Sequence, residues 1–153
     1  MVVKSFRGLL ADGGQDRISL GTIKGKVGYR VAKFEIMPQA PGTTDYESGV
    51  MIWKALQTTV STAALDIDFG NSKLLAAAYM LVAAGPTQGN NSSTTIFDNE
   101  IVNQDIYVTH TNVEGSGAAG NMNYYIELEQ FTLASDEATV ATLRDIRTES
   151  QNQ

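Results

Sequence analysis

Short runs in which apolar and polar residues alternate recur along the chain, and Gly, Pro and Asn separate them. The clearest run begins at Tyr124, where Tyr124, Ile126 and Leu128 occupy every second position. Successive side chains of a β-strand point to opposite faces, so this period of two predicts a strand with one buried face. About eight such segments separated by turn residues are typical of a mainly β domain. We therefore expect a single β-sandwich or jelly-roll-like domain over residues 1–153.

The first part of the chain is expected to hold a hairpin and one long strand. Val3–Leu10 and Arg17–Leu20 flank Ala11–Gln15, whose Asp-Gly-Gly sequence tolerates the positive φ angles of a tight turn. Within Lys26–Met37 the apolar positions alternate as far as Val31 and then slip by one residue. A β-bulge produces such a slip, so we predict one long, bent strand.

The segment Val50–Leu56 is apolar on both faces. Such a strand is either central, with cover on both sides, or it packs one face against another subunit. Leu74–Ala84 is a second apolar run whose composition fits a helix or a strand, and we favour the strand. The candidate interface residues come from these two runs and from the C-terminal segment; they are Val50, Met51, Trp53, Leu74, Tyr79 and Leu143.

The rest of the chain is expected to continue with strands and polar loops. Leu65–Phe69 is predicted to be a short strand, and Thr87–Thr95 a polar loop. Further strands are predicted at Val102–His110 and Tyr124–Leu133, with a Gly-rich hairpin loop at 112–121 between them.

One helix is predicted, over about residues 136–147. Ser135 or Asp136 can cap its start, and Val140, Leu143 and Ile146 form an apolar stripe along one side. Residues 148–153 are a polar tail.

The charge and the apolar runs argue against nucleic-acid and membrane partners. The formal net charge is −6, whereas binding to a phosphate backbone depends on clustered Lys and Arg. The longest apolar run is about half of the roughly 20 residues that a membrane helix needs. The N-terminal residues lack the contiguous apolar segment of a secretion signal. We therefore expect synthesis in the cytoplasm and no export.

Few residues could support catalysis or bind a metal. The chain has no Cys and a single His, His110, which is expected to be structural. Asp66 and Asp68 precede a turn but lack the further oxygen ligands of a calcium loop. Glu127 and Glu129 share a strand face at a glycosidase-like spacing, although a solvated face explains them more simply. We predict no catalytic, cofactor or metal residues, and a hydrolase built on these two glutamates is the distant alternative.

Six motifs together carry a family resemblance: GQDRISL at 14–20, KGKVGY at 24–29, IFDNE at 96–100, NQDIYVTH at 103–110, NYYIELE at 123–129 and EATVATLRDIR at 137–147. They resemble a group of small virion proteins of tailed bacteriophages, especially those of marine bacteria and cyanobacteria. The resemblance covers most of the chain. It implies a virion component and assigns no functional residues.

The role that the resemblance implies is that of a capsid decoration, or cement, protein on the outer capsid surface. An acidic chain fits that position better than the interior, because packaged DNA would repel it. The expected partners are the major capsid protein and further copies of the chain, in a homo-oligomer such as a trimer. The alternative is a receptor- or glycan-binding module of a tail or fibre. It would use the Tyr-rich strands or the loops at 87–95 and 112–121.

Overall fold

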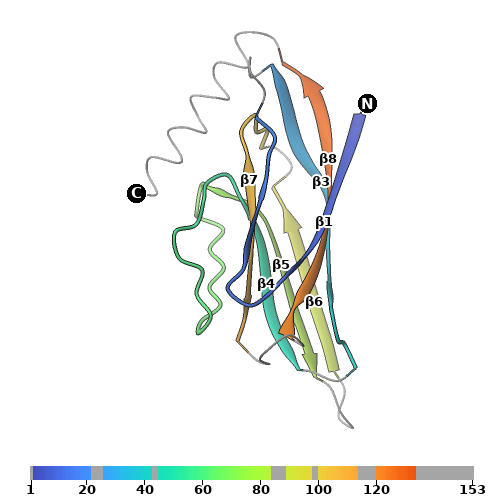
Figure 1. Cartoon of the computed structure of the whole chain (residues 1–153), viewed down its shortest axis with the longest axis vertical. Helices are drawn as coiled ribbons and strands as arrows, with labels where there is room; N and C mark the ends of the chain where they lie inside the picture. The colour runs from blue at the N-terminus through green and yellow to red at the C-terminus, as the bar shows by residue number, and fades with distance from the viewer. Residues whose placement is uncertain are drawn as a thin grey trace.

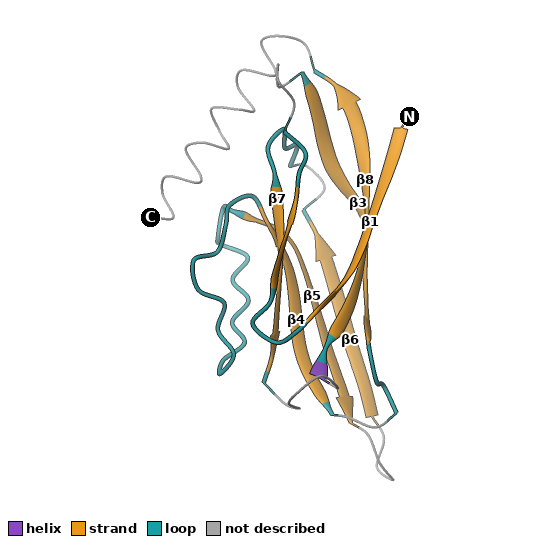
Figure 2. Ribbon diagram, in the orientation of Figure 1, coloured by secondary structure: helices purple, strands orange, loops and turns teal. Residues whose placement is uncertain are grey.

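A computed structural model describes residues 2–21, 26–42, 45–83, 89–97, 100–113 and 120–133. These ranges contain eight strands and no α-helix (Figure 1); the short purple piece in Figure 2 is a 3₁₀ turn at Gly120. The strands are β1 (Val2–Leu10), β2 (Gln15–Ile18), β3 (Val27–Pro38), β4 (Tyr46–Trp53), β5 (Leu74–Ala83), β6 (Gly89–Ile96), β7 (Ile106–Asn112) and β8 (Met122–Thr132). They form two antiparallel sheets, one in the order β1-β8-β3 and one in the order β2-β7-β4-β5-β6. The prediction of a mainly β chain is confirmed.

One hydrophobic core draws its side chains from both sheets. The alternation predicted from Tyr124 onward is the buried face of β8, the central strand of the three-stranded sheet, and Ile126 and Leu128 are fully buried. Facing residues from the five-stranded sheet complete the core; they include Val50, Ile52, Ala76, Ala78, Ile106 and Val108. Burial of apolar surface between the sheets is the main stabilising term for such an arrangement.

The bulge predicted in the long strand is present. β3 pairs with β8 over its whole length, and the register shifts between Val31 and Lys33. Val31 and Phe34 are both buried, although their separation in sequence breaks strict alternation. The extra residue lets both apolar halves of the strand face the same core.

The hairpin predicted near the N-terminus is wrong. β1 pairs with β8, and β2 pairs with β7, so the turn between β1 and β2 carries the chain from one sheet to the other (Figure 1). The turn itself has the expected chemistry, since Gly13 has a φ of 80°. Its N–H donates to the carbonyl of His110 at 2.9 Å. A tight turn permits a hairpin, but the two available partner strands decide the pairing.

The segment Val50–Leu56, which is apolar on both faces, contributes to a central strand, and this is the first of the two interpretations of its sequence. β4 lies between β7 and β5, and its Val50 and Ile52 face the main core. On the opposite face, Met51 and Trp53 join Leu74 in a second apolar cluster.

The cover over this second cluster is the chain's own segment 54–73. In Figure 2 the segment is a loop beside the five-stranded sheet, on the side away from β3 and β8. Leu65 and Ile67 pack against the cluster, and Leu65 occupies the space that a side chain on Gly49 would need. The Thr111 hydroxyl donates to the carbonyl of Ser61 at 2.8 Å and ties the loop to β7. The strand predicted at Leu65–Phe69 is therefore wrong, because its apolar residues cover a sheet without joining one.

The strand predicted at Leu74–Ala84 is confirmed over Leu74–Ala83, whereas the polar loop predicted at Thr87–Thr95 is wrong from Gly89 onward; residues 84–88 lie outside the described ranges. Residues from Gly89 onward form β6, which pairs with β5 along its length. A ladder uses backbone groups that every residue here supplies, so polar side chains do not prevent a strand at the sheet edge.

Two further boundaries differ from expectation. β7 begins at Ile106, and Val102 forms only an isolated bridge with Tyr29. β7 and β8 belong to different sheets, so the connection at 112–121 is not a hairpin loop.

The predicted helix at 136–147, its Leu143 and the tail at 148–153 lie outside the described residues. Within the described ranges no helix is long and apolar enough to cross a membrane.

Candidate functional site

A cleft of about 850 Å³ opens between the two sheets. Its apolar lining includes Phe34 and Ile36 of β3, Met80 of β5 and Tyr124 of β8, and its other lining residues are Arg7, Gly8, Glu35, Met37, Ser92, Thr94, Asn123 and Tyr125. The one carboxylate among them, Glu35, lies 3.5 Å from the ammonium group of Lys33. The cleft thus suits an apolar group more than acid–base chemistry, which needs convergent titratable side chains.

Tyr124 links the two sheets beside this cleft. Its ring lies over Gly8 of β1, where an added Cβ would come within 2.8 Å of it. Its hydroxyl donates to Asp16 Oδ2 of β2 at 2.7 Å. Burial, reinforced by the Asp16 carboxylate, raises the pKa of Tyr124, so the hydroxyl stays a donor at neutral pH.

His110 is paired with a serine that the sequence did not single out. Its Nδ1 lies 3.0 Å from the carbonyl oxygen of Leu10, and its Nε2 lies 3.1 Å from Ser48 Oγ. A carbonyl only accepts, so Nδ1 carries the proton and Ser48 donates to Nε2. This is the geometry of a nucleophile and its base, but both side chains are fully buried. Burial lowers the pKa of His110 against the weaker opposing effects of Leu10, Ala11 and Asp12.

Glu127 and Glu129 lie on the outer face of the three-stranded sheet. Glu129 forms an ion pair with Arg30, and Glu127 lies 3.8 Å from Lys33 of the same neighbouring strand. Neither glutamate lines the inter-sheet cleft. Each carboxylate thus faces a cation across the β3–β8 ladder, an arrangement typical of cross-strand stabilisation.

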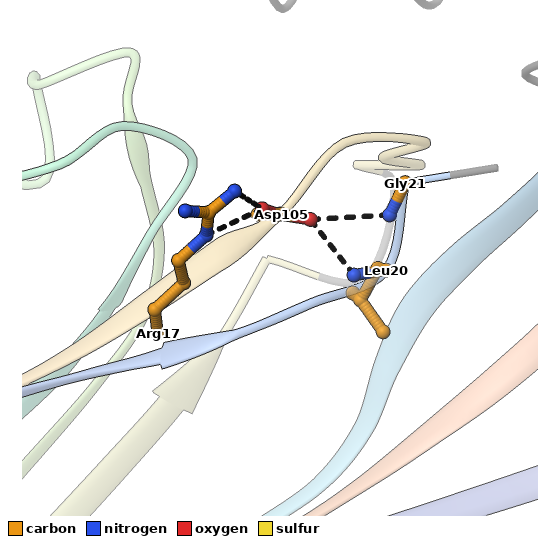
Figure 3. A network of polar contacts seen from close by, with 4 residues as sticks. All are labelled: Arg17, Leu20, Gly21 and Asp105. Atoms are coloured by element: carbon orange, nitrogen blue, oxygen red, sulfur yellow. Dashed lines mark hydrogen bonds and ion pairs between the residues drawn. The ribbon is translucent and has the colours of Figure 1, made fainter. Parts of the chain in front are cut away.

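Asp105 joins Arg17, Leu20 and Gly21 in a polar network through a single carboxylate (Figure 3). One oxygen accepts from the backbone N–H groups of Leu20 at 2.9 Å and Gly21 at 3.1 Å. The other accepts from Arg17 Nε at 2.6 Å and forms an ion pair with the same guanidinium. Partial burial opposes ionisation, but these donors outweigh it and hold the pKa of Asp105 below its usual value. The network fixes the end of β2 against the start of β7.

The candidate interface residues fall into separate places. Met51, Trp53 and Leu74 come together in the second apolar cluster, while Val50 is in the main core. All four are buried by the chain itself, so they expose little surface to a second copy. Tyr79 is half-buried further along β5, where burial and the Glu47 carboxylate raise its pKa.

A small pocket of about 320 Å³ lies at the end of β6. Phe69, which is 55% exposed, contacts Phe97 edge to face with ring centroids 5.2 Å apart. Polar groups of Asn71, Ser72 and Glu100 also line it. The sequence interpretation missed this aromatic pair, because Phe69 was assigned to a strand.

Of the two aspartates considered for calcium, Asp68 has a local role. The Asp68 carboxylate accepts the N–H of Gly70 at 2.8 Å within its own turn. Among the residues that the structure describes, no three or more His, Cys, Asp or Glu side chains come together as a metal site would require.

Comparison with known proteins adds no family. No protein-family model matches the chain, and a search of the curated proteins found no match.

Proposed function

We propose that this chain is a non-enzymatic structural protein of a bacteriophage virion, a capsid decoration protein that binds and stabilises the outer capsid lattice. The motif resemblance supports the virion assignment. The observation that carries the structural role is that the side chains best suited to catalysis, His110, Glu127 and Glu129, are each engaged in bonds within the chain. We also propose that the two sheets form a β-sandwich of jelly-roll-like type, which their shared core supports.

The surface that we assign to the capsid is the outer face of the three-stranded sheet. Val3, Leu9 and Met37 are 48%, 43% and 66% exposed there. Leu9 and Met37 lie opposite Asn123 on the two neighbouring strands, so one apolar side chain stands on each side of this polar residue. Ion pairs of Arg30 and Lys33 with the glutamates of β8 lie on the same face. Apolar contacts rimmed by polar groups are typical of interfaces, and many copies on a lattice add weak contacts into tight binding.

Localisation on the particle tests the assignment. Electron microscopy of intact virions labelled with an antibody to this chain should place it at many sites on the outer capsid. Label confined to the tail, or absent from particles, contradicts the proposal.

A matched pair of variants tests the assigned face. Met37→Glu should lower capsid occupancy by about tenfold, because it buries a charge in the contact. Leu56→Glu places the same charge at an apolar residue that is 51% exposed, in the loop over the other sheet, and should leave occupancy unchanged. Equal occupancy for both variants rules out this face.

The pocket at Phe69 supports a second candidate, a glycan-binding module of a tail or fibre. Sugar C–H groups stack on exposed aromatic rings, and the pocket is also lined by Asn71, Ser72 and Glu100, whose carboxylate is ion-paired with Lys54. Binding to a glycan array that Phe69→Ala abolishes would favour this candidate over capsid decoration.

A further inference from the structure

Each sheet of the described structure has two edge strands, and three of these four edges carry features that oppose pairing with another strand. β1 carries Lys4 and Arg7, and β2 is only four residues long. β3 carries charged residues, a bulge and a terminal proline, Pro38. Charges, shortness, bulges and proline are the means by which proteins keep sheet edges from associating.

The fourth edge, β6, has none of these features. Its sequence GNNSSTTI is uncharged and contains no proline, and β6 pairs with β5 without a register shift. Among the described residues no strand pairs with its other side. The charge-free region extends beyond the strand, because no Asp, Glu, Lys, Arg or His occurs from residue 74 to residue 97. β5 and β6, the last two strands of the five-stranded sheet, therefore carry no charged side chain.

We propose that β6 pairs antiparallel with β6 of a second copy about a two-fold axis, so that the two five-stranded sheets join into one continuous sheet. The pairing deepens the proposed function, because it names the edge through which copies of the decoration protein meet.

The neutrality of β6 is what selects a second copy as the occupant. In a two-fold interface each group meets its own counterpart or a neighbour from the same patch, so a charged edge would oppose like charges. Each copy carries a net charge of −6, which adds a general repulsion. The uncharged edge brings no further charge to the contact. Ser and Thr side chains in directly opposite positions also form hydrogen bonds across antiparallel strands.

Cysteine scanning tests the pairing directly, because the natural chain has no Cys. A two-fold axis through an antiparallel pair places one residue opposite its own copy. Single Cys substitutions from Asn90 to Thr95 should therefore give an intermolecular disulfide at the position on the axis under mild oxidation. Ser5→Cys, on the exposed edge strand β1, should give none. Cross-linking at Ser5→Cys with none in β6 overturns the proposal.

A pair of lysine variants gives the equilibrium test. Ser93→Lys and Ser5→Lys each add one positive charge at an exposed serine of an edge strand. By sedimentation equilibrium, Ser93→Lys should weaken the dimer by about tenfold, and Ser5→Lys should leave it unchanged. Thermal melting of both variants checks that they are folded. A parent protein that stays monomeric at every concentration, or a dimer insensitive to Ser93→Lys, contradicts the pairing.

The two proposals fail in different ways. Capsid binding by a strictly monomeric protein would leave the decoration role in place and remove the β6 pairing. A β6 dimer that does not bind capsids would do the reverse.

Discussion

At the scale of single residues, one carboxylate and one imidazole hold distant segments together. The Asp105 carboxylate accepts hydrogen bonds from the backbone of Leu20 and Gly21 and from the Arg17 side chain. The His110 ring connects β1 to β4 through hydrogen bonds with Leu10 and Ser48. Both groups have pKa values displaced by their surroundings, so each links stability to pH.

Asp105→Ala is expected to lower the free energy of unfolding at pH 7 by about 1–3 kcal/mol, because two backbone donors and a guanidinium lose their acceptor. The folded state holds the pKa of Asp105 below its unfolded value of about 3.9. Its contribution is therefore complete above about pH 4 and is lost as the pH falls through the folded pKa. Urea unfolding at pH 7 and below pH 4 should show the difference from the parent shrinking on acidification. Asp66→Ala, at an exposed position, is the control and should change stability by less than about 0.5 kcal/mol.

His110→Gln is expected to fold and to retain partner binding, because Gln can also donate to Leu10 and accept from Ser48. Burial lowers the folded pKa of His110, so below about pH 6.5 the unfolded chain binds a proton that the folded chain does not. The parent should therefore lose stability as the pH falls from about 7 to 5, and the variant should lose less. Denaturant midpoints over this range measure the effect, and parallel curves would show that His110 does not titrate as described.

At the scale of elements, the turn between β1 and β2 carries the chain from one sheet to the other. Gly13→Ala should destabilise the fold by about 1–3 kcal/mol, since the φ of 80° disfavours a side chain. An added Cβ would also lie 2.8 Å from Thr62 Cγ2. Gly42→Ala is the matched control, because a Cβ there meets nothing within 4 Å. Chemical denaturation compares the two, and equal losses would remove the special role of the Gly13 conformation.

At the scale of the whole molecule, the charge of −6 repels copies from one another, whereas the β6 edge is neutral. Salt screens the repulsion and leaves the backbone contacts in place. The dimer should therefore become several-fold tighter when ionic strength rises from about 0.01 M to 0.15 M, where the Debye length falls from about 30 Å to 8 Å. Sedimentation equilibrium at both salt concentrations measures this. A dimer that weakens with salt would instead be held by ion pairs between the two copies.

Much of the secondary structure follows from the sequence alone, because side-chain alternation is a local property. The buried face of β8 and the bulge after Val31 are read from the positions of apolar residues within a few neighbours. The sequence favours the strand at Leu74–Ala83, but its composition also fits a helix. The charge-free stretch from 74 to 97 is equally visible in the sequence, but it gains meaning only when β6 proves to be an edge.

The tertiary structure decided everything that depends on which edges and faces meet. β1 and β2 took partners from the last third of the chain, and β6 formed because the backbone of β5 offered a ladder that polar residues can join. The apolar residues of 54–73 became the cover of a sheet, because the second face of β4 had to be buried. Ser48 and His110 are far apart in sequence, and only the pairing of β4 with β7 brings them within hydrogen-bonding distance. Alternation specifies where a side chain points, whereas pairing and burial depend on long-range contacts between complete faces.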